Sequence, residues 1–215
     1  MKTERTTIRR KPKRGSYDRE TIDAILDEAL ICHLGLIRDG YPRVLPTLHA
    51  RAGDHVYVHG SAASRALRAL GGGAEACLTA TLVDGIVLAR SAVHHSVNYR
   101  SVVLFGKAHP LESDDDKSEA LAALTEKLVP GRWGDARLPT PQELKATSVL
   151  RLPIIEASAK VRTGGPVEEE SDYELDVWAG VIPLELRRLA PEPDSELRAG
   201  IELPDYLGSV GATMR

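Results

Sequence analysis

Disulfide pairs, long apolar runs and an excess of one charge are all missing from this chain of 215 residues. Cysteine occurs only at Cys32 and Cys77, which is too few for a disulfide framework and is typical of a reducing compartment. No apolar run reaches the roughly 18–20 residues of a membrane span, and the first residues lack the apolar core of a signal peptide. The formal net charge is −3, so no global basic excess attracts polyanions. The sequence therefore predicts a globular cytoplasmic protein that does not bind membranes.

Motifs of several catalytic chemistries are also absent. The His, Cys, Asp and Glu residues do not have the spacing of a metal site, and there is no Ser-His-Asp or Cys-His signature of a nucleophile. The glycines at 71–73 end a predicted helix instead of opening one, so they are not a dinucleotide-binding fingerprint. We therefore predict no metal site of these kinds.

The first residues are strongly basic, with Glu4 as the single acid among the first fourteen. Such an arm can bind nucleic acid electrostatically, but no aromatic residue is interleaved to stack on bases. We favour a solvated, disordered arm over residues 1–16 and keep nucleic-acid binding as the weakest functional hypothesis. A single domain is expected over residues 17–190, followed by a C-terminal extension over 191–215.

The pattern along the chain is that of a mainly β protein. Helices are expected to begin after Asp18, at Ser64, at Ser113 and near Pro141. Turn signals divide short β-type runs. Asp39-Gly40 predicts a hairpin, and a second turn over residues 52–54 makes the first three strands a meander. Asp84-Gly85 predicts another hairpin. Pro153 interrupts a later strand and so predicts an edge position or a bulge, and the acidic residues 168–172 are expected in a solvated loop. Together these elements predict an antiparallel β-barrel with peripheral helices.

A strand-to-helix junction is the first candidate site. A β-type run ends at His59, and Gly60, Ser61, Ser64 and Arg65 follow at the start of a predicted helix. A helix N-terminus offers unpaired backbone N–H groups and the positive end of the helix dipole. With two hydroxyls and a guanidinium added, the junction suits a phosphate.

A second candidate site is a run of polar side chains immediately before an apolar strand. The run begins at His94 and His95 and continues through Asn98, Tyr99, Arg100 and Ser101. Polar groups are costly on a core element unless they have partners. A bound nucleotide-like cofactor accounts for both sites.

The combined motifs resemble the pyridoxamine 5′-phosphate oxidase-like superfamily, and most closely its flavin-nucleotide-binding branch with the nitroimidazole-reductase-like proteins. The resemblance covers roughly residues 17–189. It rests on the two runs above and on four further segments: Pro130-Gly131-Arg132-Trp133, Thr147-Ser148-Val149, Ser158-Ala159-Lys160-Val161-Arg162 and Trp178-Ala179-Gly180-Val181-Ile182-Pro183.

The resemblance implies a split β-barrel of the FMN-binding type that forms a homodimer, with one flavin nucleotide, FMN or FAD, in each groove at the interface. Ser61, Ser64 and Arg65 would hold the phosphate, and His59 would lie near the flavin and the substrate. The isoalloxazine ring would meet the backbone of Pro46, Thr47 and Leu48, and Asn98, Tyr99, Arg100 and Ser101 would complete the pocket. The C-terminal phosphate-binding Arg and His residues of the true pyridoxamine phosphate oxidases are missing, which argues against the vitamin B6 reaction.

Two questions stay open in the sequence. His94 or His95 would ligate iron if haem binds, as it does in some relatives, or both lie in a solvated loop. Trp178 either packs in the core, which we favour, or forms an aromatic wall for the flavin of a partner subunit. The leading hypothesis is a flavin-dependent oxidoreductase for a small planar acceptor, with His59 as its proton donor or orienting group. The alternative is a flavin- or haem-binding carrier or sensor without efficient turnover.

Overall fold

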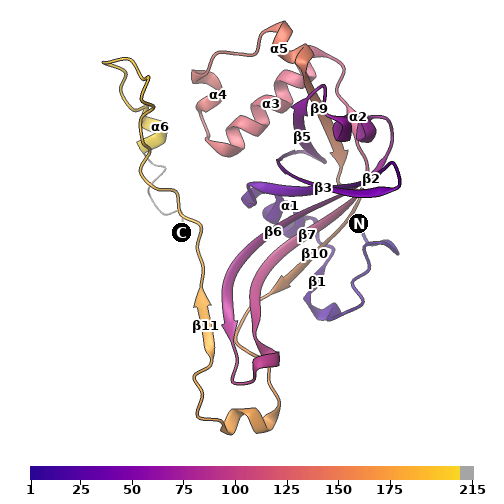
Figure 1. Cartoon of the computed structure of the whole chain (residues 1–215), viewed down its shortest axis with the longest axis vertical. Coiled ribbons are helices and arrows are strands. Elements are labelled where there is room, and N and C mark those ends of the chain that lie inside the picture. Colours follow the sequence, from indigo (N-terminus) through magenta and orange to yellow (C-terminus); the bar gives the residue numbers. More distant parts are fainter. Residues whose placement is uncertain (209–215) are drawn as a thin grey trace.

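The computed structural model describes residues 1–208 and consists mainly of two antiparallel sheets (Figure 1). The larger sheet has the strand order β1-β10-β7-β6-β2-β3, and β11 also pairs with β6. Its strands are β1 (Gly15–Ser16), β2 (Ile31–Arg38), β3 (Tyr41–Leu48), β6 (Glu75–Leu88), β7 (Ser96–Lys107), β10 (Glu156–Arg162) and β11 (Gly180–Pro183). The smaller sheet has the order β4-β5-β9-β8, with β4 (Ala50–Ala52), β5 (His55–Ser61), β8 (His109–Pro110) and β9 (Thr147–Pro153). This architecture confirms the predicted mainly β fold of the split-barrel type.

The structure contains six α-helices within the described residues, and four of them begin where the sequence predicts a helix to start. Asp18, Ser64, Ser113 and Thr140 each accept a hydrogen bond from a backbone N–H of the first helical turn. The helices are α1 (Arg19–Glu28), α2 (Arg65–Gly71), α3 (Asp114–Leu128), α4 (Arg132–Asp135), α5 (Pro141–Ala146) and α6 (Asp205–Gly208). Three single turns of 3-10 helix cover Pro12–Arg14, Ala92–His94 and Glu170–Glu174.

The core joins buried residues of both sheets with α1 and α2. Every second residue of β2 is buried, and these residues pack with Ile22, Ile25 and Leu26 of α1. The turn between β2 and β3 has positive φ at both Asp39 and Gly40, as a two-residue hairpin of the Asp-Gly type requires. The predicted hairpin is therefore confirmed. After it, the chain leaves the sheet at His49, so β4 and β5 belong to the smaller sheet instead of extending a meander.

The predicted hairpin at Asp84-Gly85 is wrong. The chain runs straight through these residues as β6, and Asp84 forms a bulge in the ladder between β6 and β7. Gly85 instead permits the close approach of β11, because a Cβ there would lie 3.0 Å from Val181 Cγ1. An Asp-Gly pair favours a turn locally, but pairing with two neighbouring strands keeps this segment extended.

Two further local predictions need correction. Pro153 is the last residue of β9, which lies between β5 and β8, so it neither interrupts the strand nor marks it as an edge strand. Glu168 does not lie in solvent: its side chain has 0% exposure, and its carboxylate accepts hydrogen bonds from the backbone N–H groups of Arg90 and Ser91 at 2.5 and 3.0 Å. Burial by itself raises the pKa of Glu168, but the hydrogen bonds from Ser91 and Arg90 outweigh it and the pKa is lowered.

A buried polar pair joins α3 to the end of α1. The Lys127 ammonium donates to Leu26 O and Ala29 O, both at 2.7 Å, and lies 3.1 Å from Nε2 of His49. His49 is 1% exposed. Burial lowers the pKa of Lys127 to about 8, and burial together with the nearby ammonium lowers the pKa of His49 to about 4. The lysine thus caps the C-terminal carbonyls of α1 beside a neutral imidazole.

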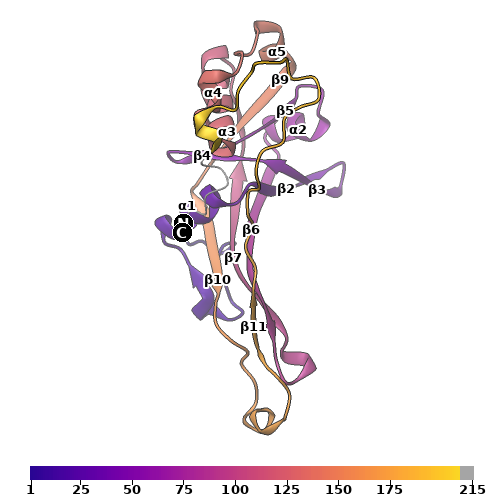
Figure 2. The ribbon, with the colours of Figure 1, turned by 90° about the vertical axis from the view of Figure 1, so that its left-hand side faces the viewer.

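The two chain ends follow different courses. Near the N-terminus Thr6 is buried, and Arg5 forms ion pairs with Glu75 and Glu156, so this basic segment lies against the sheet; the domain boundary at residue 16 stays a prediction. Beyond β11 the chain runs along the molecule to α6 without joining either sheet (Figures 1 and 2). Within residues 1–208, no helix is long and apolar enough to cross a membrane.

Candidate functional site

The predicted phosphate junction lies where β5 ends and α2 begins. Ser64 is the N-cap of α2 and accepts a hydrogen bond from Leu67 N at 3.4 Å, while Ser61 Oγ accepts one from Ala63 N at 3.2 Å. Each serine oxygen thus serves as an acceptor, and within the described chain neither hydroxyl proton has an acceptor. Gly60 allows α2 to pack closely, since a Cβ there would lie 2.9 Å from Leu67 Cδ1. The junction therefore presents two hydroxyl donors to an incoming anion.

Arg65 is the first residue of α2, and its side chain is exposed. Within residues 1–208 its guanidinium makes no ion pair or hydrogen bond, whereas Arg68, one turn later, donates to Ala63 O at 2.9 Å. A guanidinium without a carboxylate partner next to two hydroxyl donors fits a phosphate.

The predicted ring-binding segments share one end of the larger sheet. Thr47 of β3 is opposite Cys32, Cys32 is opposite Ala80, and Ala80 is opposite Val102 of β7. In the next row across the sheet, Leu48 is opposite Ile31 and Ser101 is opposite Thr81. Three strand spacings, roughly 14 Å, therefore separate Leu48 from Ser101. The sheet therefore brings Pro46, Thr47 and Leu48 to the same end as Ser101, and β3 also contacts β5, which carries the phosphate junction.

The polar residues of β7 have partners within the chain. Arg100 forms ion pairs with Glu28 of α1 and with Asp84, the latter at 2.8 Å, and these hydrogen bonds raise the pKa of its guanidinium. Ser101 Oγ lies 3.4 Å from Lys160 O. Arg100 is thus held by two carboxylates, which leaves it little capacity to bind a flavin.

Asn98 and Tyr99 lie beside a residue whose role the sequence did not indicate. Asn98 is buried and accepts a hydrogen bond from Arg162, which is 5% exposed and is also opposite Tyr99 in the ladder between β10 and β7. The guanidinium of Arg162 also donates to Gly164 O and Gly165 O, at 3.2 and 3.0 Å, and its Nε has no partner among residues 1–208. Burial lowers the pKa of Arg162. Asn98 therefore serves as a hydrogen-bond acceptor for a buried guanidinium. In the sequence, the only signal for this role is that Arg162 follows the small residues of β10.

His59 is half-buried near the end of β5. It lies on the same face of the strand as Tyr57, which packs against residues of α3, and its Nδ1 is buried without a hydrogen-bond partner in the described structure. Burial lowers the pKa of the His59 imidazole. At neutral pH the ring is therefore neutral, so it acts as a proton acceptor or orienting group more readily than as a proton donor.

The two candidate haem ligands lie at the tip between β6 and β7, and their contacts differ. His95 Nδ1 accepts a hydrogen bond from Ala89 N at 2.8 Å, so the ring proton is on Nε2 and that nitrogen has no lone pair for iron. His94 Nδ1 is buried without a partner in the described chain. This geometry fits His94 as an iron ligand better than His95.

Trp178 does not pack in the core, contrary to the preferred prediction. It is 68% exposed, and its ring lies over Gly180, where a Cβ would be 2.8 Å from the ring. The reason is its place just before β11, outside both sheets.

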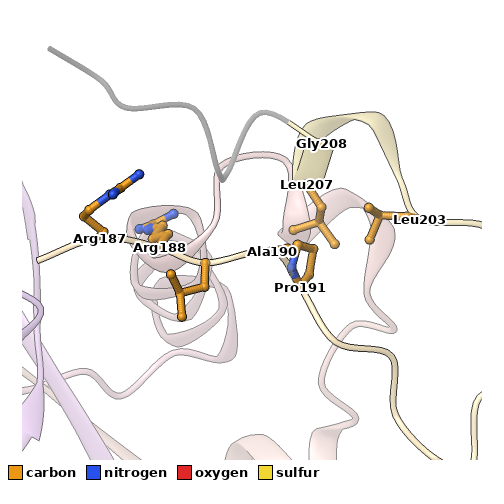
Figure 3. Close-up of a pocket in the computed structure, with 8 residues that line it drawn as sticks. Arg187, Arg188, Ala190, Pro191, Leu203, Leu207 and Gly208 are labelled. Carbon is orange, nitrogen blue, oxygen red and sulfur yellow. The ribbon is translucent and has the colours of Figure 1, made fainter.

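Two surface hollows lie away from the predicted site residues. One, of about 420 Å³, is formed by two stretches of the C-terminal segment, and Figure 3 shows Pro191 and Leu207 facing each other across it. The other lies between α3 and the smaller sheet, beside Tyr57 and Arg151. Neither is lined by a residue predicted to bind flavin.

The two sheets define a protein of the split β-barrel type. The chain belongs to the pyridoxamine 5′-phosphate oxidase family, whose sequence profile matches residues 18–161. A search of curated proteins finds no match.

Solved structures extend the similarity to almost the whole chain. The flavocytochrome Anf3 from Azotobacter vinelandii is 41% identical with a TM-score of 0.92, and the alignment covers 97% of both chains. The FAD and haem binding protein from Mycobacterium smegmatis is 38% identical with a TM-score of 0.88, over 92% of this chain and 97% of that one. A candidate 5-nitroimidazole antibiotic resistance protein from Bacteroides thetaiotaomicron, 21% identical with a TM-score of 0.56 over 68% of this chain and 86% of its own, shares the fold.

Proposed function

We propose that this protein binds a flavin nucleotide and haem and acts as an oxidoreductase on a small planar acceptor. The observation that carries the proposal is the similarity of 41% and 38% over nearly the full length to a flavocytochrome and to an FAD and haem binding protein. The relative from Mycobacterium smegmatis, an FAD and haem binding protein, favours FAD over FMN as the flavin.

The junction after β5 supports the flavin part of the proposal. Arg65, with no ion pair in the described structure, and the hydroxyl donors of Ser61 and Ser64 would hold the flavin phosphate. Pro46, Thr47 and Leu48 would present backbone to the ring. Among the polar residues of β7, Tyr99 and Ser101 are better placed to reach the ring than Arg100 and Asn98, which already have charged partners.

We expect a homodimer to complete the flavin-binding groove at its interface. The outer face of β2, β3 and β6 exposes Ile31, Ile37, Val44 and Val83, and exposed apolar sheet faces mark interfaces. A two-fold homodimer through this region would bring the exposed Trp178 of one protomer toward the flavin of its partner.

The histidines divide the remaining roles. His94 would ligate the haem iron, while His95 stays bound to the backbone N–H of Ala89. Bound flavin and haem supply the electron-transfer chemistry, which no side chain here can supply. His59, neutral at physiological pH, would orient the acceptor or take up a proton.

The absorbance spectrum of the purified protein tests this proposal. We expect flavin bands together with a Soret band, and release of the flavin by denaturation followed by chromatography should identify FAD. His94→Ala should abolish the Soret band and retain the flavin bands, whereas His95→Ala should keep both. A spectrum without flavin would refute the proposal. Flavin and haem without turnover in the presence of reductant and acceptor would leave a carrier or sensor instead.

A further inference from the structure

Five cations lie within six residues near the start of the chain. Only Pro12 interrupts the five, which are Arg9, Arg10, Lys11, Lys13 and Arg14. We call residues 9–14 the basic loop. The net charge of the whole chain is −3 with these cations included, so the remainder of the protein is more acidic still. The basic loop is therefore a local positive patch on a negative protein.

Contacts at its base hold the basic loop in place. Ile8 N donates to the Tyr17 hydroxyl at 2.8 Å, and Gly15 lies against Ile8, since a Cβ there would be 2.8 Å from Ile8 Cδ1. Gly15 pairs with Lys160 of β10, so the loop stands at the edge of the larger sheet (Figure 1). Lys11 has a φ of 56°, a left-handed conformation that glycine adopts at less cost. The chain thus keeps a charged side chain where glycine would be less strained.

Most of this charge has no counter-charge within the described residues. The only ion pair of the loop in residues 1–208 joins Arg9 to Glu4 at 3.9 Å, and these side chains are 80% and 91% exposed. The other four cations form no ion pair in that range. Glu75 and Glu156, on neighbouring strands, pair with Arg5 instead. Because unpaired surface cations add little to stability, they are available to an anionic partner.

One row of the sheet connects the basic loop with the proposed flavin site. Gly15 is opposite Lys160, and Lys160 is opposite Ser101 of β7. Two strand spacings, roughly 10 Å, therefore separate the base of the loop from Ser101, which we propose reaches the flavin ring. Lys160 projects from the same face as Ser101 and also has no ion pair in the part of the chain that the structure describes. A partner bound at the loop would thus come close to the flavin over a positively charged surface.

The proposed function needs a source of electrons. A bound flavin turns over only if a donor reduces it again after each reaction. Protein electron carriers form small, transient complexes, and opposite charges bring the two surfaces together. A cationic loop fixed near the flavin therefore suits a carrier with an acidic surface.

A nucleic acid fits the basic loop less well. The loop has no aromatic side chain on which a base could stack. The acidic remainder of the protein would also repel a long polyanion, whereas a small globular protein can contact the loop alone.

We propose that the basic loop docks an acidic one-electron carrier protein of the ferredoxin kind, which reduces the bound flavin. Each encounter oxidises one carrier by one electron. Two reduced carriers thus supply the two electrons that one flavin takes up together with two protons from water. The loop raises the rate of encounter and orients the carrier, and it takes no part in holding the flavin. This inference deepens the proposed function and rests on it.

Two triple variants with the same change of charge test the proposal. The loop variant combines Arg10→Gln, Lys11→Gln and Lys13→Gln. The control variant combines Arg187→Gln, Arg188→Gln and Arg198→Gln in the segment after β11. All six side chains are exposed and form no ion pair within residues 1–208, so neither variant threatens folding. The probe is photoreduced plant-type ferredoxin, an acidic iron–sulfur protein.

Stopped-flow absorbance follows reduction of the bound flavin by this ferredoxin. At low salt the loop variant should be reduced about ten- to a hundredfold more slowly than the wild type, and the control variant should react like the wild type. The three rates should converge near 1 M salt, where the Debye length is about 3 Å. Reduced methyl viologen, a small donor that needs no docking surface, should reduce all three proteins equally. Calorimetric titration with oxidised ferredoxin should show the same loss of affinity in the loop variant without electron transfer.

The outcomes separate this inference from the proposed function. Equal rates for the wild type and the loop variant, equal losses in both variants, or a wild type that ferredoxin reduces at no salt concentration would overturn the inference, while flavin bands in the spectrum leave the proposed function standing. A purified protein without flavin removes the proposed function and the inference with it. A short DNA duplex that binds more tightly than ferredoxin, and loses this affinity in the loop variant, would assign the loop to nucleic acid and also overturn the inference.

Discussion

The imidazole of His49 should make this protein lose stability in mildly acidic solution. His49 lies where the chain passes from the larger to the smaller sheet and is almost completely buried. Its Nε2 lies 3.0 Å from Leu26 O and 3.1 Å from the Lys127 ammonium, and its Nδ1 is buried without a partner in the described chain. Protonating the ring would place a second cation beside Lys127 in a buried site, which is the physical reason for its low pKa.

The size and sign of the effect follow from the two pKa values. The pKa of His49 is lowered from 6.5 to about 4 in the folded state, so between these values the unfolded chain binds the additional proton. The stabilising contribution is fully present above pH 6.5 and is lost as the pH falls toward 4. Linkage gives a loss of about 2.5 kcal/mol between pH 7.5 and 4.5 from this residue alone, which is a large part of a typical free energy of unfolding.

Urea unfolding followed by circular dichroism at a series of pH values measures this loss. His49→Gln keeps an acceptor for Lys127 and removes the titration. The variant is expected to start less stable at pH 7.5, because its fit is poorer, and then to fall less steeply than the wild type. The difference in unfolding free energy between the two proteins should change by about 2.5 kcal/mol across the range. Parallel curves would refute the argument that a neutral, buried His49 supports the fold.

Three further predictions concern the candidate site. Arg65→Ala should weaken FAD binding about ten- to a hundredfold by removing a charge-assisted hydrogen bond, while riboflavin binding and the Arg68→Ala control stay near wild type in fluorescence titrations; equal losses for both ligands would exclude this junction as the phosphate site. Asn98→Ala should lower the free energy of unfolding by about 1–3 kcal/mol because the buried Arg162 loses an acceptor, and Asn98→Asp should restore it; urea denaturation checks both. His59→Gln should leave flavin affinity intact but slow reoxidation of the reduced protein by the acceptor, and the wild-type rate should have its inflection below pH 6.5 because the pKa of His59 is lowered; identical stopped-flow pH profiles would make His59 structural.

The sequence was sufficient wherever the deciding interactions are local. The caps Asp18, Ser64 and Ser113 bond to N–H groups three residues away, and the Asp39-Gly40 turn needs only two residues with positive φ. The junction after β5 could be predicted as a candidate phosphate site for the same reason, because Ser61, Ser64 and Arg65 are neighbours in the chain. Such short-range patterns determined the helix starts, the first hairpin and the candidate phosphate site before any tertiary contact was known.

The remaining features depended on partners far away in the sequence. Asp84-Gly85 has the composition of a turn, yet β11, almost a hundred residues later, keeps it extended. From the sequence Arg100 is expected to bind a ligand, but in the structure it forms an ion pair with Glu28. Glu168 is expected in solvent, but its carboxylate accepts hydrogen bonds from the backbone N–H groups of Arg90 and Ser91. Local sequence determined what each segment can form and which side chains could bind an anion. Only the tertiary structure decided which polar groups are already paired and which remain available, because burial and pairing depend on which distant segments meet.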